Sequence, residues 1–150
     1  HSFAERGLAA QSFGSLDYDD WAEVMRVNVF GPTRMAEAFL PQLLASRQKK
    51  IVTLTSIVGS MELNTSGGLY AYRSSKAAVN AVMRSMAIDL APQGVLAVAI
   101  HPGWARTEMG GPKAPLEPAD AVRGVRRVIA ALRPEQLGRV LGYDGEVLPY

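Results

Sequence analysis

The sequence predicts an α/β protein built on half of a doubly wound parallel sheet. Helical and strand-like segments alternate along the chain in the order helix, strand, helix, strand, helix, strand. This order is typical of parallel strands joined by right-handed crossovers. The two clearest strand segments are short apolar runs rich in β-branched residues, as expected of strands buried on both faces. We therefore expect one domain over residues 1–150, with about three strands and flanking helices.

The first helix is expected to begin at Asp17, a residue type that suits an N-cap, after a loop over residues 1–16. Asn28 falls on the inward-facing apolar stripe of this helix. A buried amide is costly without hydrogen-bond partners, so Asn28 has either a structural or a functional role, and the spacing leaves both open. The Gly31-Pro32 pair is expected to kink or interrupt the helix. The resumed helix carries an apolar stripe of Met35, Phe39, Leu40, Leu43 and Leu44.

Ser56 stands at the C-terminal end of the first strand segment, residues 51–56. Ligands of open α/β sheets bind outside the carboxyl ends of the strands. A serine at such a place either belongs to a ligand site or bonds the backbone of its own loop. A loop over residues 57–69 is expected to follow.

Tyr72 and Lys76 lie in the central helix, predicted over residues 70–91, and their spacing of four places them on one face. A phenol ionises near pH ~10, and a nearby ammonium lowers that pKa. A tyrosine tuned in this way can exchange a proton with a substrate oxygen near neutral pH. The same short pattern also describes an ordinary tyrosine and a solvated lysine. The apolar stripe of this helix is expected to be core and comprises Val79, Val82, Met83, Met86 and Leu90.

The second strand segment, residues 95–100, leads into Pro102-Gly103. These residues remove side-chain bulk at the carboxyl end of the strand, which suits a planar ligand close to the backbone, although Pro-Gly is also a common turn pair. The Gly- and Pro-rich loop over 104–116 could close over a site. The remaining predicted elements are a helix that starts at Glu117-Pro118 and a strand within residues 138–143.

Composition narrows the possible partners. Charged residues make up 20% of the chain and the formal net charge is only +2, which argues against nucleic-acid binding. Cysteine is absent and the two histidines, His1 and His101, are far apart in sequence, so no metal site is expected. No apolar run approaches the ~20 residues of a membrane span, and no signal peptide is visible. We expect a cytoplasmic protein with neither a membrane nor a nucleic-acid partner.

The residues singled out above occur in the order and spacing of the short-chain dehydrogenase/reductase family. The chain resembles that family from about Gly7 to Tyr150, through Asn28, Ser56, Tyr72, Lys76 and the Pro102-Gly103…Thr107 turn. Further segments resemble its C-factor/sniffer-like carbonyl reductase subgroup: Asn64-Thr65-Ser66-Gly67-Gly68, His101-Pro102-Gly103-Trp104, Met109-Gly110-Gly111-Pro112 and Tyr143-Asp144-Gly145. The resemblance implies a Rossmann-type fold and an oxidoreductase that transfers a hydride between NAD(P)(H) and a carbonyl or alcohol.

The resemblance also implies a role for each matching residue. Tyr72 would be the general acid/base, and Lys76 would lower its pKa and bond the nicotinamide ribose. Ser56 would bond the substrate oxygen, and Asn28 would hold a water that links Lys76 to solvent. The implied cofactor-binding residues are Asn28, Tyr72, Lys76, Pro102, Gly103, Trp104 and Thr107.

The sequence departs from the family in lacking the amino-terminal half. No Gly-rich pyrophosphate turn is present, so the chain is expected to hold only the nicotinamide end of NADP or NAD, with NADP slightly favoured. The strand at 51–56 would expose a sheet edge. Family members commonly pair through two helices, here residues 33–46 and 72–91, so a homo-oligomer is possible. The chain starts at His1 and not Met, which keeps open an alternative: a non-catalytic binding or signalling fragment derived from such an enzyme.

Overall fold

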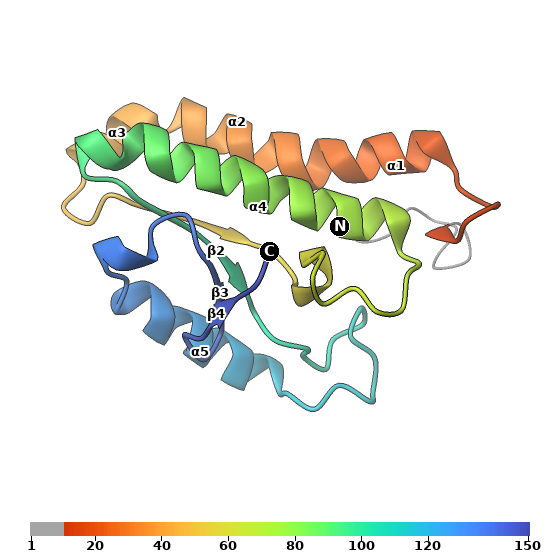
Figure 1. The fold of residues 1–150 in the computed structure, drawn as a ribbon. Helices are drawn as coiled ribbons and strands as arrows, with labels where there is room; N and C mark the ends of the chain where they lie inside the picture. Colours follow the sequence, from red (N-terminus) through yellow and green to blue (C-terminus); the bar gives the residue numbers. More distant parts are fainter. Residues whose placement is uncertain (1–10) are drawn as a thin grey trace.

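The computed structural model describes residues 11–150, and the part of the expected loop that falls on residues 1–10 lies outside them. Figure 1 shows three layers: helices α1 to α4 cover one face of a central sheet, and α5 covers the other. This is the arrangement expected for a doubly wound α/β fold, so the predicted fold class is confirmed.

The sheet contains four strands in the order β1-β2-β3-β4. β1 (Lys50–Leu54), β2 (Leu96–His101) and β3 (Val140–Gly142) are parallel, and all three correspond to predicted strands. β4 (Val147–Leu148) pairs antiparallel with β3 and was not predicted, because two residues are too few to show a strand period.

In the part of the chain that the structure describes, β1 forms one edge of the sheet. Within the described residues β1 pairs only with β2. Beside β1 lies a hollow of about 300 Å³, lined by β1 and by the helices before it. Met35 and Phe39, which line it, are 58% and 54% exposed, so the apolar stripe predicted after Pro32 is not closed core but faces this edge.

The first helical region is a chain of four segments. α1 (Tyr18–Met25) is N-capped by Asp17, as predicted, and continues through the π-helical turn η2 (Arg26–Phe30) into α2 (Gly31–Ala38) and α3 (Leu40–Ala45). The expected interruption at Gly31-Pro32 therefore takes the form of a π-turn immediately before it. Pro32 has no N–H for the carbonyl four residues back, and the Gly31 N–H bonds Arg26 O, five residues back.

The long helix α4 (Tyr70–Leu90) is the main support of the sheet. Val79 and Met83 are buried against β2 and β3, and Val82 and Met86 pack at the margin of the same cluster, which confirms most of the predicted stripe. On the opposite face, α5 (Pro118–Ala130) buries Val128 against the sheet. The short 3₁₀ turns are η3 (Ile57–Gly59), η4 (Ala91–Gln93) and η5 (Pro134–Gln136).

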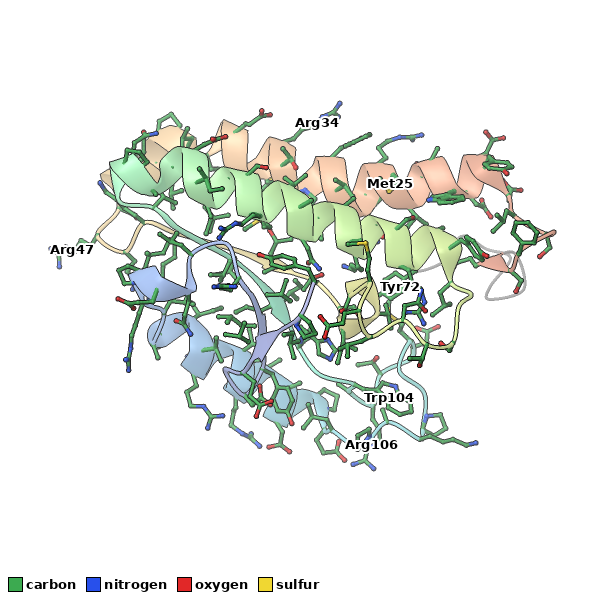
Figure 2. All side chains as sticks on the ribbon, viewed as in Figure 1. Met25, Arg34, Arg47, Tyr72, Trp104 and Arg106 are labelled. Carbon is green, nitrogen blue, oxygen red and sulfur yellow. The ribbon has the colours of Figure 1, made fainter. Side chains whose placement is uncertain are left out.

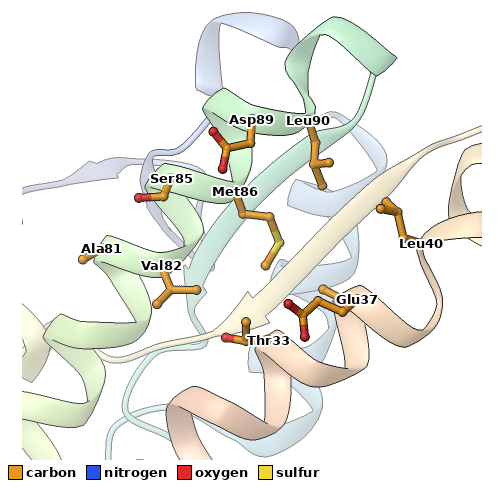
Figure 3. A pocket seen from close by; sticks show the side chains of 10 residues that line it. Thr33, Glu37, Leu40, Ala81, Val82, Ser85, Met86, Asp89 and Leu90 are labelled. Carbon is orange, nitrogen blue, oxygen red and sulfur yellow. The ribbon is translucent and has the colours of Figure 1, made fainter.

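A second hollow, of about 510 Å³, lies between α2/α3 and the C-terminal half of α4. Figure 3 shows Met86 of α4 directed toward Thr33 and Glu37 of α2 across this space. The hollow lies between the two helical segments that the sequence analysis named as a possible surface for self-association.

The η3 turn packs so closely on α4 that only glycine fits at its last position. A Cβ on Gly59 would lie 2.8 Å from both the carbonyl carbon and the Cβ of Lys76. Contacts this short do not occur in folded proteins, so the turn or the helix would have to move.

Met83→Ala tests the core beneath α4. We expect the free energy of unfolding to fall by about 2–5 kcal/mol, because Met83 is 2% exposed and its truncation leaves a cavity. Ile88→Ala is the matched control on the same helix: Ile88 is 58% exposed, and its change should stay within about 0.5 kcal/mol. Denaturant titration measures both, and equal losses would contradict the assignment of this core.

Gly59→Ala tests the contact between η3 and α4. The added methyl group meets helix backbone, which cannot rotate away, so we expect a loss of about 1–3 kcal/mol in unfolding free energy. Gly31→Ala is the control, because its Cβ would meet nothing closer than 3.7 Å and Gly31 is helical. Thermal unfolding measures the stability of the two variants. If Gly59→Ala is as stable as the wild type, then η3 and α4 can move apart to admit the methyl group.

Candidate active site

The candidate site forms where α4 begins, beside the carboxyl ends of β1 and β2. Ser56 follows β1 by two residues, and Tyr72 and Lys76 lie in the first two turns of α4. Figure 2 shows Tyr72 on the side of α4 that meets η3, at the same end of the molecule as Trp104. Three of the residues predicted from sequence are thus brought together, although they come from separate elements.

Lys76 is buried and directed toward the sheet. Its Nζ donates a hydrogen bond to the carbonyl oxygen of Leu54, the last residue of β1, at 3.1 Å. Burial lowers the pKa of Lys76. Nζ also lies 5.7 Å from the centre of the Tyr72 ring. An ammonium carries three donors, and Leu54 takes one, so this group has the capacity to bind further hydroxyl groups.

The pKa of Tyr72 differs from the sequence-based expectation. Burial raises it above the ordinary value for tyrosine, and a side-chain hydrogen bond with Ser56 acts in the opposite direction. The expectation that the pKa of Tyr72 lies below its ordinary value is therefore not met, because burial outweighs the hydrogen bond with Ser56.

Ser56 is held by the turn that follows it. It is the N-cap of η3, and its Oγ accepts a hydrogen bond from the Val58 N–H at 3.4 Å. Because Oγ accepts from the backbone, its own proton can be directed at the Tyr72 oxygen or at a substrate oxygen. Ser56 therefore bonds the backbone of its own loop and also faces Tyr72.

Asn28 is buried in the π-turn η2 and is hydrogen-bonded to α4. Its Nδ2 donates to Ser75 Oγ at 2.9 Å, and Ser75 Oγ donates to the Tyr72 carbonyl at 2.8 Å. Gln11 Oε1 accepts the Tyr72 N–H at 3.0 Å. These bonds position the first turn of α4. Gln11 and Ser75 were not predicted from the sequence. Ser75 lies three residues after Tyr72, and this spacing is a weak signal; Gln11 is 61 residues away from Tyr72 and offers none.

The predicted cofactor-binding segment after β2 lies partly at the end of the strand and partly in the exposed loop that follows. Gly103 adopts φ +85°, a backbone conformation that favours glycine, and its Cα faces the side chains of Leu116 and Tyr143. Trp104 is 55% exposed, with Nε1 bonded to Gly110 O at 2.8 Å. Thr107 is exposed, and its Oγ1 accepts the Gly110 N–H at 3.1 Å. Gly103 follows Pro102 at the strand end, whereas Trp104 and Thr107 stabilise the loop.

His101 is the last residue of β2. From the sequence it was expected only to lead into the Pro102-Gly103 turn. Among the described residues, its Nδ1 is the one buried side-chain polar atom without a hydrogen-bond partner. Burial lowers the pKa of His101, and the charge of Asp144 opposes this shift.

Residues 11–150 contain no group of His, Asp and Glu that could hold a metal ion, and no helix there is long and apolar enough to cross a membrane.

Comparison with known proteins gives a consistent result. The short chain dehydrogenase family model matches residues 6–117. C-signal from Myxococcus xanthus is 46% identical over 139 residues, which cover 93% of this chain and 84% of that protein.

Solved structures agree. The carbonyl reductase Sniffer of D. melanogaster superposes with a TM-score of 0.89 at 34% identity, covering 93% of this chain and 60% of that one. The NADPH-bound carbonyl reductase from chicken fatty liver gives 0.87 at 29% identity, covering 94% and 61%. The chain thus spans about three fifths of these two carbonyl reductases. With its fold, the order of its site residues and a family match over most of its length, the chain belongs to the short-chain dehydrogenase family.

Proposed function

We propose that this chain carries the catalytic half of an NAD(P)-dependent oxidoreductase that interconverts a carbonyl and an alcohol. The observation that carries the proposal is the convergence of Ser56, Tyr72 and Lys76 at the carboxyl end of β1, with the tyrosine hydroxyl hydrogen-bonded to the serine. The likeness to two carbonyl reductases, one of them bound to NADPH, supports the same reaction.

The donor set at the site fits the nicotinamide end of NADP or NAD. The Lys76 ammonium has donors beyond the one taken by Leu54, which suits the hydroxyl groups of a ribose. Pro102 and Gly103 present backbone with little side-chain bulk at the neighbouring strand end, where a flat ring can approach, and Trp104 and Thr107 would border it from the loop. When bound, the nicotinamide supplies the hydride chemistry.

The protein's own part in the reaction is to hold and move a proton. In reduction, Tyr72 donates its hydroxyl proton to the carbonyl oxygen as that oxygen gains charge, and Ser56 stabilises the same oxygen by a hydrogen bond. Lys76 Nζ lies 5.7 Å from the centre of the Tyr72 ring, and its positive charge would favour the phenolate once it forms. Asn28 positions the first turn of α4 through Ser75 and would complete the proton path to solvent.

Two finer assignments belong to the same proposal. The substrate is a small carbonyl or alcohol, because the residues at the site recognise one oxygen and one flat ring. A homo-oligomer would form through α2/α3 and α4, the helices that border the hollow in Figure 3.

A second candidate function is that of a non-catalytic binding or signalling protein. The observation in its favour is the 46% identity to a protein named C-signal. Loss of the Tyr72 hydroxyl distinguishes the two functions, because a surface-mediated role does not need it.

Tyr72→Phe tests the proposed function directly. In the protein expressed from its complete gene, we expect carbonyl reduction, followed as NADPH or NADH consumption, to fall by about 10²–10⁴-fold because the acid is removed. Tyr70→Phe is the control: it removes a phenol two residues earlier on the same helix and should leave the rate unchanged. A Tyr72→Phe variant with the wild-type rate would disprove the assignment.

Ser56→Ala tests the contribution of Ser56 to the pKa of Tyr72, which opposes the larger effect of burial. The hydrogen bond from Ser56 favours the Tyr72 phenolate, so its removal raises the pKa of Tyr72. Alcohol oxidation needs the phenolate, and the rising limb of its kcat/KM–pH profile should therefore move to higher pH. Ser85→Ala, an exposed serine on α4, serves as the control. A downward shift for Ser56→Ala would contradict the assignment.

A further inference from the structure

The loop between β1 and α4 carries Ser56 at one end, and the Arg73 side chain of α4 hydrogen-bonds it at three places. We infer that Arg73 is a positioning residue for Ser56: its guanidinium holds the η3 turn in the orientation that points the serine hydroxyl at Tyr72. This inference rests on the proposed function, because Ser56 matters to the rate only if the site performs the reaction.

The link from Arg73 to Ser56 runs through a single residue, Val58. Arg73 Nη1 donates to the Val58 carbonyl oxygen at 3.1 Å. The N–H of Val58 in turn donates to Ser56 Oγ. Arg73 therefore holds the residue whose N–H orients the catalytic hydroxyl, although it does not touch that hydroxyl itself.

The same guanidinium also fastens the far end of the loop. Nη2 donates to Ser66 Oγ at 2.9 Å and Nε donates to Gly67 O at 3.3 Å. Gly67, Gly68 and Leu69 all have positive φ, of 64°, 65° and 53°, so the chain turns sharply here to enter α4. A left-handed conformation at a leucine persists only where its surroundings hold it, and Arg73 supplies bonds at this place.

The loop has a second anchor, formed by the carbonyl oxygen of Tyr150. The Tyr150 carbonyl oxygen accepts Ser60 Oγ at 3.0 Å, Met61 N–H at 3.0 Å and Glu62 N–H at 3.3 Å. Ser60 is only 4% exposed and directly follows η3. With this anchor intact, loss of Arg73 should leave the loop folded but free to rotate about its Ser60 end.

The geometry demands a guanidinium and not merely a positive charge. Three nitrogens of one planar group serve acceptors at Val58, Ser66 and Gly67, on both arms of the loop. A lysine carries a single nitrogen on a flexible stem and cannot reach acceptors on both arms at once. Arg73→Lys should therefore resemble Arg73→Met in its effect.

The experiment compares Arg73→Met and Arg73→Lys with the wild type, in the protein expressed from its complete gene. We expect kcat for carbonyl reduction to fall by about 10- to 100-fold, as a small misplacement of a catalytic group does. Arg84→Met is the matched control, because Arg84 lies three turns further along α4 and also donates to a loop carbonyl, that of Leu137. Its kcat should stay at the wild-type value.

A double-mutant cycle separates positioning from general damage. If Arg73 acts through Ser56, then Arg73→Met should cost almost nothing in a Ser56→Ala background. Hydrogen exchange supplies a readout without activity: amides of residues 57–67 should lose protection in Arg73→Met, while those of α4 beyond the first two turns keep it. A full additional loss in the Ser56→Ala background, or unchanged protection of the loop, would overturn the inference.

The two proposals fail in different ways. A wild-type protein that reduces no carbonyl compound would refute the proposed function. Hydrogen exchange would then still test whether Arg73 holds the loop in place, independently of any activity. An active wild type with an equally active Arg73→Met variant would refute the positioning role and leave the proposed function standing.

Discussion

The contact on which the site depends is the one between Gly59 and the backbone of Lys76. It lets the η3 turn rest directly on α4, with no side chain between them. Ser56 stands on the strand side of this contact, and Tyr72 and Lys76 stand on the helix side. The distance between the hydrogen-bond donors of the site is therefore set by backbone packing, which is stiffer than any pair of side chains.

Polar bonds from four other places then fix the orientation of these groups. Asn28 acts through Ser75 on the backbone of Tyr72, and the strand carbonyl of Leu54 holds Lys76. Tyr150 and Arg73 hold the loop that follows Ser56. Each bond is modest in energy, but together they restrict the positions of the Ser56, Tyr72 and Lys76 side chains. The hydrophobic layers beneath α4 keep all of these elements in register.

The sequence predicted much of the fold because its signals are local. Buried strands, the stripe on α4 and the Asp17 cap each follow from spacing within one segment. The resemblance to a known family placed Ser56, Tyr72 and Lys76 in one site. The π-turn, the role of Ser56 in the pKa of Tyr72 and the bonds made by Arg73 could not be predicted in this way. They depend on which atoms meet across elements, and residue spacing does not carry that information.

The π-turn at Arg26–Phe30 has a consequence for how the length of this region can vary. Each added or deleted helical residue rotates everything on one side by about 100° relative to the other. Removing one residue from the turn would swing either Asn28 away from Ser75 or the indole of Trp21 away from Ser74 Oγ, to which it donates at 2.8 Å. A one-residue insertion or deletion between Trp21 and Asn28 is therefore expected to break one of these two hydrogen bonds. The exposed residues 63–65 lie in a loop between the anchored residues 60–62 and 66–67, so a change of length there does not rotate one helix against another.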